Sequence, residues 1–201
     1  MSMDRTAQIK RETTETSIAL DLDLDGSGRA EVATGVGFLD HLMTALAKHA
    51  QFDLVLTCRG DLEIDDHHTV EDCGIVLGSA IDEALGERVG LVRFGSAFAP
   101  LDEALARAVV DLSGRGAAFV DLSLQRESIG ALATENIPHF VGSLAQNAGI
   151  TVHLDVLKGE NDHHRAEAAF KALALALRQA VSTTGSSDVP STKGYLAGGR
   201  R

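Results

Sequence analysis

The sequence is poor in cysteine and has no long apolar run. Its two cysteines, Cys58 and Cys73, lack the spacing of a zinc motif and are too few for a disulfide scaffold. We therefore expect buried free thiols in a reducing cytoplasm. No segment approaches the ~20 consecutive apolar residues of a membrane span, and residues 1–15 lack the apolar region of a signal peptide. These absences predict a cytoplasmic protein with no membrane partner.

Positive charge is also scarce. The chain carries 18 Lys and Arg against 29 Asp and Glu, which gives a formal net charge of −11. General nucleic-acid binders present a basic surface, so a nucleic-acid partner is not expected. An anionic substrate is compatible with this charge if cationic side chains gather locally. The 201 residues suffice for one large domain or two small ones with a proper core.

The histidines, in contrast, follow a repeated pattern. The motif D-H-H-x-x-E occurs at 66–71 and again at 162–167, and a single histidine precedes each copy, His41 before the first and His139 before the second. Six of the eight histidines therefore belong to one duplicated constellation. His and Glu clustered in this way predict a duplicated protein built around metal ions. The two remaining histidines, His49 and His153, have no counterparts and are assigned no role.

Helix geometry divides these donors between two ions. The first histidine and the glutamate of each motif are four residues apart, so they share a helix face and reach one ion together. These pairs are His67 with Glu71 and His163 with Glu167. The second histidine lies about 100° around the helix and points elsewhere. We expect the second histidines, His68 and His164, to cross to the opposite ions.

The donor types limit the choice of metal. With the two single histidines included, the donors form two sites of three His and one Glu. Imidazole with carboxylate suits Mn, Fe, Co, Ni or Zn, and excludes a dedicated Ca or Mg cage. The positive end of a helix dipole disfavours imidazolium, so histidines at a helix N-terminus stay neutral for metal binding.

Hydrophobic periodicity predicts the secondary structure. Helices are expected over 38–50, 67–85, 134–148 and 163–181, and the second of them is expected to be capped by Asp66. Strands are expected over 18–26, 52–58 and 150–157, and a hairpin is expected to join 107–112 to 117–124. The tail after Ser182 is expected to be loop.

The two halves of the chain follow the same β-β-α-β-α order. This order favours an α+β fold in which helices cover one face of each sheet. We predict one domain made of two pseudo-equivalent halves, about 6–95 and 96–182, with a C-terminal tail over 183–201 and no linker.

The sequence resembles the imidazoleglycerol-phosphate dehydratase family of histidine biosynthesis. The resemblance rests on F-L-D-H at 38–41, D-D-H-H-T-V-E-D at 65–72, R-F-G at 93–95, P-L-D-E-A at 100–104, D-L-S-G-R at 111–115, H-H-x-x-E-A-x-F-K at 163–171 and P-S-T-K-G at 190–194. It covers nearly the whole chain and is weakest over 121–137.

The resemblance implies a fold, a reaction and an assembly. The fold would be two halves like domain 2 of ribosomal protein S5, with helices sandwiched between two four-stranded sheets. The reaction would be the dehydration of D-erythro-imidazole-glycerol phosphate to imidazole-acetol phosphate and water, with two Mn²⁺ ions in each active site. The assembly would be a homo-oligomer of 24 subunits with octahedral symmetry and active sites where subunits meet.

The resemblance also implies residue roles. The metal ions would act as Lewis acids and orient the substrate. The metal ligands would be His41, His67, His68, Glu71, His139, His163, His164 and Glu167. Proton transfer falls to a carboxylate, either Glu167, which we favour, or Glu71 or Glu15. The phosphate would be bound by Arg93, Arg115, Lys171, Ser191 and Lys193, because arginine suits bidentate phosphate contact and lysine supplies a point charge.

Two other functions are compatible with a metal-binding chain. A dinuclear metal hydrolase would use two ions to activate a bridging water, but such sites bring several carboxylates, and this set has two carboxylates for six histidines. A non-enzymatic assembly protein stapled by metal ions would have no use for the phosphate-binding residues.

Overall fold

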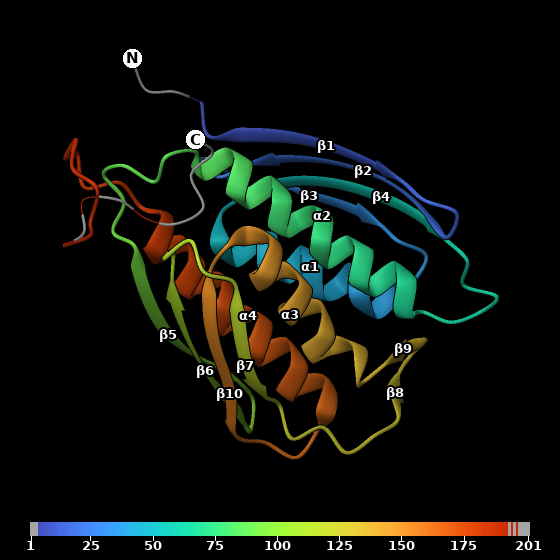
Figure 1. The fold of residues 1–201 in the computed structure, drawn as a ribbon. Coiled ribbons are helices and arrows are strands. Elements are labelled where there is room, and N and C mark those ends of the chain that lie inside the picture. The colour runs from blue at the N-terminus through green and yellow to red at the C-terminus, as the bar shows by residue number, and fades with distance from the viewer. Residues whose placement is uncertain (1–3, 193, 195, 197–201) are drawn as a thin grey trace.

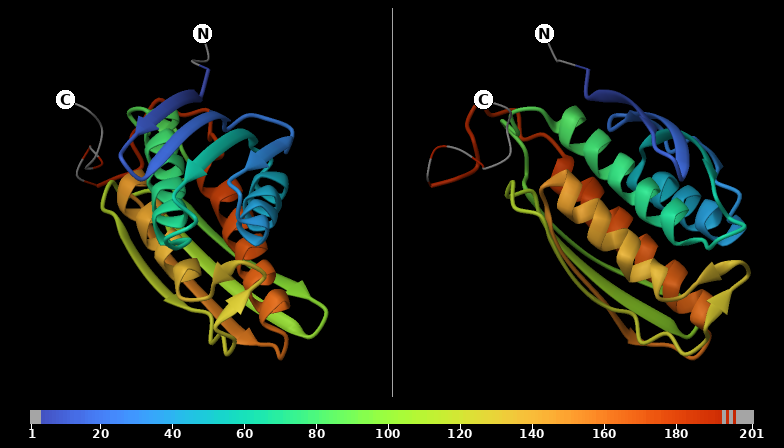
Figure 2. Two further views of the ribbon diagram at one scale, coloured as in Figure 1. Left: turned by 90° about the vertical axis from the view of Figure 1, so that its right-hand side faces the viewer. Right: turned by 45° about the vertical axis from the view of Figure 1, so that its right-hand side comes forward.

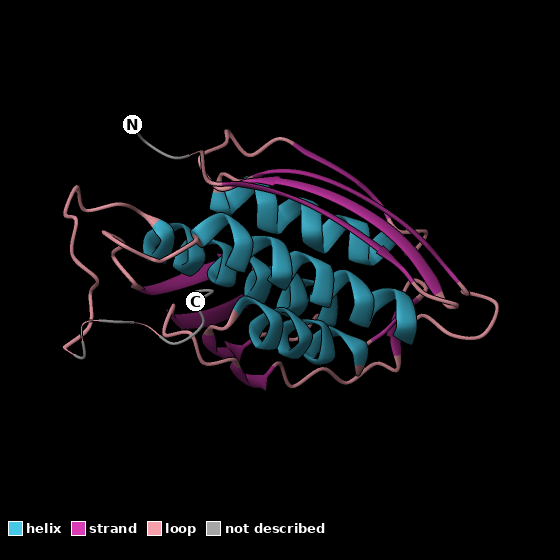
Figure 3. Ribbon diagram, turned by 45° about the horizontal axis from the view of Figure 1, so that its top comes forward, coloured by secondary structure: helices cyan, strands magenta, loops and turns pink. Residues whose placement is uncertain are grey.

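Four helices lie between two four-stranded sheets (Figure 1) in the computed structural model, which describes residues 4–192, 194 and 196. The predicted α+β sandwich is therefore confirmed over this part of the chain. Figure 2 shows the layers from two further sides, and Figure 3 shows the helices with one sheet above them and the other below. Within the same residues, no helix has the length and apolar character needed to cross a bilayer.

The two halves repeat one topology. The first half comprises β1 (Thr6–Glu12), β2 (Thr16–Asp23), β3 (Ala30–Ala33), α1 (Gly37–Ala50), β4 (Asp53–Gly60) and α2 (His67–Leu85). The second comprises β5 (Phe94–Leu101), β6 (Ala104–Asp111), β7 (Ala117–Asp121), a small β8 (Ser128–Ile129) and β9 (Leu132–Ala133) hairpin, α3 (Asn136–Ala148), β10 (Thr151–Lys158) and α4 (Asp162–Val181). The sheet orders β1-β2-β4-β3 and β5-β6-β10-β7 are equivalent, and the last pair of each is parallel.

Three details differ from the sequence prediction. The first half has one strand more than expected before its first helix, and the second half has one more strand in its main sheet and the small β8–β9 hairpin. The predicted hairpin of 107–112 with 117–124 is wrong, because β10 lies between β6 and β7 and pairs with both. Alternating hydrophobicity identifies strands but not their neighbours, which are chosen by long-range packing. The second sheet begins at Phe94, two residues before the expected second half.

The cap predicted for α2 is also wrong. The side chain of Asp66 makes no capping hydrogen bond and instead accepts from the backbone N–H of Ala133 (2.8 Å) and from Asn136 Nδ2 (2.9 Å). Asp65 accepts from the backbone N–H of His67 in its place, at 2.8 Å. Asp66 thus ties the start of α2 to the start of α3.

The helices pack in two pairs, α1 with α4 and α2 with α3. Gly78 allows α2 to approach α3 closely, since a Cβ there would lie 2.5 Å from the carbonyl oxygen of Leu144. Phe140 of α3 and Phe170 of α4 are fully buried, with ring centroids 5.7 Å apart, and join the pairs into one core.

All four helices begin at the same end of the molecule, and the described part of the tail lies at the opposite end (Figure 1). The tail is held there by hydrogen bonds between Thr184 and Gly90 and by a bridge of Thr183 with Leu91. Side chains near the helix N-termini are therefore brought together, and they include both D-H-H-x-x-E motifs.

Candidate metal centres

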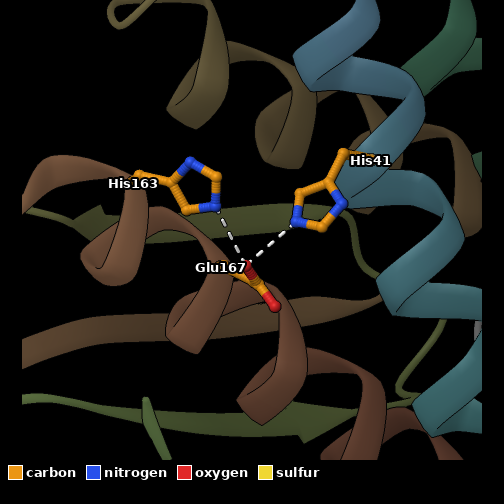
Figure 4. Close-up of side chains that lie close together, drawn as sticks. All are labelled: His41, His163 and Glu167. Atoms are coloured by element: carbon orange, nitrogen blue, oxygen red, sulfur yellow. Dashed lines mark hydrogen bonds and ion pairs between the residues drawn. The ribbon is translucent and has the colours of Figure 1, made fainter. Parts of the chain in front are cut away.

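The first candidate centre joins α1 to the start of α4. His41 Nε2 lies 2.9 Å from Glu167 Oε2, and His163 Nε2 lies 3.1 Å from the same oxygen (Figure 4). His163 and Glu167 share a helix face, as their spacing predicts. The three donor atoms lie within 4.8 Å of one another.

The second centre joins α2 to α3 in the same way. His139 Nε2 lies 3.2 Å from Glu71 Oε1, and His67 Nε2 lies 4.0 Å from Glu71 Oε2. The rings of His67 and His139 are stacked, with centroids 4.7 Å apart. Each centre therefore offers two imidazole nitrogens and one carboxylate oxygen, a set that fits a divalent transition metal.

The single histidines are exchanged between the halves. His41, from the first half, completes the second motif, and His139, from the second half, completes the first. The cause is the helix pairing, because α1 packs on α4 and α2 packs on α3. Neither triad can form within one half of the chain.

His68 and His164 belong to neither triad. Each ring is close to perpendicular to that of its neighbouring histidine, at 79° for His67 with His68 and 87° for His163 with His164. Helix geometry predicts this divergence. Within the described residues, neither ring joins a cluster of three metal-binding donors.

The charge on Glu167 suits a metal ligand. Burial opposes its ionisation, but hydrogen bonds from Lys171 (Nζ to Oε1, 2.8 Å) and His41 outweigh this effect and lower the pKa of Glu167 to about 2. The carboxylate is therefore ionised at neutral pH. His49 also faces this region from α1, and its pKa is lowered, first by burial and then by Lys171.

In the second centre, the ring of His67 is positioned by a contact with Asn136 that the sequence did not reveal. His67 Nδ1 lies 3.1 Å from Asn136 Oδ1, and the amide nitrogen of Asn136 is held by Asp66. Asp66 was visible in the motif, but the role of Asn136 depends on the packing of α3 against α2.

The residues predicted to bind phosphate are divided between the two ends of the molecule. Lys171 lies beside the first triad. Arg93 pairs with Asp111 (2.8 Å), donates to the carbonyl of Pro190 (2.7 Å), and bonds through its backbone N–H to Ala180 near the end of α4. At 1.5 Å per residue, that point is about 20 Å along the helix from Glu167.

The other predicted positions follow this division. Arg115 is exposed, and its neighbour Gly116 packs on Gln146 at the end of α3, far from the triads. Ser191 lies in the described tail. Lys193 lies outside the described residues. Glu15, at the β1–β2 turn, has Oε1 3.7 Å from His68 Nε2.

Comparison with known proteins decides the family. The family model for imidazoleglycerol-phosphate dehydratase matches residues 34–177. The chain belongs to the imidazoleglycerol-phosphate dehydratase family. This confirms the resemblance found in the sequence and the prediction of an enzyme. Residues 34–177 contain both triads and both second histidines.

Relatives and solved structures agree with this assignment. The imidazoleglycerol-phosphate dehydratase of Candida glabrata is 59% identical over 209 residues, covering 95% of this chain and 100% of that protein. That of Phytophthora nicotianae is 59% identical over 96% of this chain, which spans 43% of that longer protein. The crystal structure of the Pyrococcus furiosus enzyme in complex with (S)-C348 superposes with a TM-score of 0.81 at 39% identity, covering 94% of this chain and 100% of that one.

Proposed function

We propose that this chain converts D-erythro-imidazole-glycerol phosphate to imidazole-acetol phosphate and water. Its cofactors would be two divalent metal ions, of which Mn²⁺ is the favoured candidate. The observation that carries the proposal is the pair of His-His-Glu triads in a chain of the dehydratase family. The two buried free thiols support a reducing compartment, the cytoplasm. The two rival functions are less well supported, because neither accounts for the family match.

The reaction must remove a proton from carbon and release a hydroxyl group as water. Bound metal ions would supply Lewis acidity and orient the substrate. Glu167 is the favoured proton acceptor because it is ionised and lies in the first triad, although its lowered pKa makes it a weaker base than an ordinary carboxylate. Glu15 is a second candidate, because it is half-exposed at the β1–β2 turn and faces the same end of the molecule as the triads. Glu71, in the second triad, is the third.

The division of the site residues supports a homo-oligomer. The triads lie at the helix N-termini, whereas Arg93 and Arg115 lie at the opposite end, so one copy cannot place both around a small substrate. A neighbouring copy would bring its cationic end to the triads. This arrangement is compatible with the octahedral 24-mer that the family resemblance implies, in which active sites form where subunits meet.

A metal-replacement assay tests the proposal. The purified protein is stripped of metal, and dehydration is measured without metal and after Mn²⁺ is added back, together with metal content per chain. We expect activity only with metal, at about two ions per chain. Full activity in the stripped protein would overturn the metal dependence, and an inactive metal-loaded protein would overturn the substrate assignment.

A further inference from the structure

A carboxylate lies within hydrogen-bond distance of Nδ1 in each second histidine, His68 and His164. His68 Nδ1 lies 3.0 Å and 3.2 Å from the two carboxylate oxygens of Asp61, and His164 Nδ1 lies 2.8 Å from Glu103 Oε2. Asp61 belongs to the β4–α2 loop and Glu103 to the β5–β6 turn. Glu103 is part of the P-L-D-E-A segment, to which the sequence analysis assigns no role.

Glu103 is fixed in place on both oxygens. Its Oε1 accepts from the backbone N–H groups of Glu160 (3.1 Å) and Asn161 (2.9 Å), directly before α4. The carboxylate therefore has one oxygen committed to the backbone and the other to His164.

The opposite nitrogen of each ring faces outward. His68 Nε2 lies 3.7 Å from Glu15, and His164 Nε2 lies 3.8 Å from Asp102. Glu15 and Asp102 belong to the equivalent hairpin turns of the two halves, β1–β2 and β5–β6. Both outward nitrogens thus face negative charge at the same end of the molecule, which favours a cation there.

An Nδ1–H bond to a carboxylate fixes the tautomer of a histidine and leaves its Nε2 lone pair for a metal ion. Each triad supplies three donors, whereas the sequence pattern provides three His and one Glu for each ion. One donor per ion is therefore missing from each triad. We propose that Asp61 and Glu103 are positioning residues that present His68 Nε2 and His164 Nε2 to metal ions bound by the triads of a neighbouring copy. This inference rests on the proposed function for the metal ions and the assembly.

The two carboxylates differ in a way that gives a sharp test. Asp61 turns both oxygens toward His68, so Asp61→Asn keeps an acceptor for Nδ1–H. Glu103 uses one oxygen for the backbone and one for His164, so Glu103→Gln has a single acceptor oxygen for two tasks. We therefore expect Asp61→Asn to keep the metal affinity of the wild type and Glu103→Gln to lower it. Alanine should lower metal affinity at both positions.

The experiment measures Mn²⁺ and Zn²⁺ affinity at both sites by equilibrium dialysis, with circular dichroism as the check of folding. Asp61→Ala and Glu103→Ala should each weaken one of the two sites by about 10–100-fold, the usual effect of removing such a partner. Asp61→Asn should bind as the wild type does, and Glu103→Gln should behave like Glu103→Ala. Matched controls are Glu63→Gln, in the same loop as Asp61, and Glu160→Gln, in the β10–α4 loop that Glu103 contacts; both remove exposed charges and should have no effect.

A double variant separates positioning from a general loss of charge. In a His68→Ala background, Asp61→Ala should have no further effect on metal affinity if Asp61 acts through His68. Equal weakening in both backgrounds, or wild-type affinity in Asp61→Ala, would overturn the inference. If Glu103→Ala fails to fold, the Asp61 series decides alone.

The tautomer can be measured without metal. Nitrogen NMR of the metal-free protein labelled at histidine should show the Nδ1–H form of His68 in wild type and in Asp61→Asn, and a mixture in Asp61→Ala. An unchanged tautomer in Asp61→Ala would overturn the role of Asp61. A wild-type protein that shows the Nδ1–H form but binds neither ion would overturn the proposed metal dependence and the metal part of this inference, and would leave the tautomer control by Asp61 standing.

Discussion

His41 and Glu167 are 126 residues apart in sequence, yet His41 Nε2 lies 2.9 Å from Glu167 Oε2. The contact crosses from the first half of the chain to the second. It forms because α1 packs on α4, so the fold and the metal centre depend on the same helix pairing. Removing one side chain of the pair tests the centre with little change to the core, because the His41 side chain is 46% exposed.

His41→Ala should empty or weaken one metal site and leave the other. The loss should reach at least the ~10–100-fold in affinity that follows removal of an indirect partner, and dehydration should fall with it. Metal content per chain and activity are measured together. His153→Ala is the control, since His153 lies on the outer face of the second sheet against Phe119. Two full-affinity sites in His41→Ala would exclude His41 as a ligand.

Chelation should affect assembly as well as activity. If ligands from different copies meet at each ion, the ion joins the subunits, and its removal lowers the stability of the assembly. We expect EDTA to convert a large particle into smaller units without activity, and Mn²⁺ to restore both. Sedimentation velocity before and after EDTA gives the sizes. A particle of unchanged size after complete metal removal would show that other contacts hold it together.

Features set by local sequence were predictable. The helix α2 begins and ends where its periodicity predicts, at His67 and Leu85. The same spacing puts His67 beside Glu71, and His163 beside Glu167. Features set by packing between distant segments were not predictable. Neither the place of β10 between β6 and β7 nor the exchange of the single histidines has a local signal.

The carboxylates that contact the second histidines were likewise not predictable from the sequence. A carboxylate that orients an imidazole must be close in space, but its position in the chain is not fixed by helix or strand periodicity. Asp61 precedes His68 by seven residues, and Glu103 precedes His164 by 61. Only the folded chain shows that each carboxylate lies against Nδ1 of a second histidine, and Glu103 does so because a hairpin turn of the second sheet reaches the start of α4.

Gly78→Ala should destabilise the protein even though alanine favours helices. The added Cβ would lie 2.5 Å from the carbonyl oxygen of Leu144, so α2 and α3 must move apart. Overpacking of this kind costs about 1–3 kcal/mol, against a helix-propensity gain of about 1 kcal/mol. Thermal unfolding measures the balance.

Gly142→Ala is the matched control, because a Cβ there meets no described atom within 4 Å. It should leave the melting temperature unchanged or raise it. A Gly78→Ala protein as stable as Gly142→Ala would show that the helices can separate without cost.

Asp53→Asn should lower stability more at neutral pH than in strong acid. Asp53 accepts from Arg29 through its side chain (2.6 Å) and backbone (3.0 Å) and from the backbone of Ser27 (2.7 Å), and these bonds hold its pKa well below the usual range. A depressed carboxyl pKa gives stability that is present above the unfolded pKa of ~3.9 and is lost as pH falls through the folded pKa. The melting temperature of the variant should lie below that of the wild type at neutral pH, and this gap should begin to narrow only as the pH falls below ~4 toward the folded pKa of Asp53. Asp21→Asn, at an exposed position on β2, is the control for loss of a charge alone. A gap that does not narrow in acid would exclude ionisation as its cause.

Arg115→Ala should reduce catalytic efficiency without reducing stability. Arg115 is exposed in the loop between β6 and β7, so its removal disturbs little of the fold. If it binds the substrate phosphate, one charge-assisted contact worth roughly 1.5–3 kcal/mol is lost. That corresponds to about a tenfold to hundredfold fall in kcat/KM, since each 1.36 kcal/mol is about tenfold. Arg59→Ala, an exposed arginine on the outer face of β4, is the control for loss of charge alone.

Because Arg115 and the triads lie at opposite ends of one copy, mixing Arg115→Ala with the inactive His41→Ala protein should restore activity at sites that combine two intact surfaces. Mixed assemblies that show no more activity than their separate parents would mean that both residues serve the same copy's site.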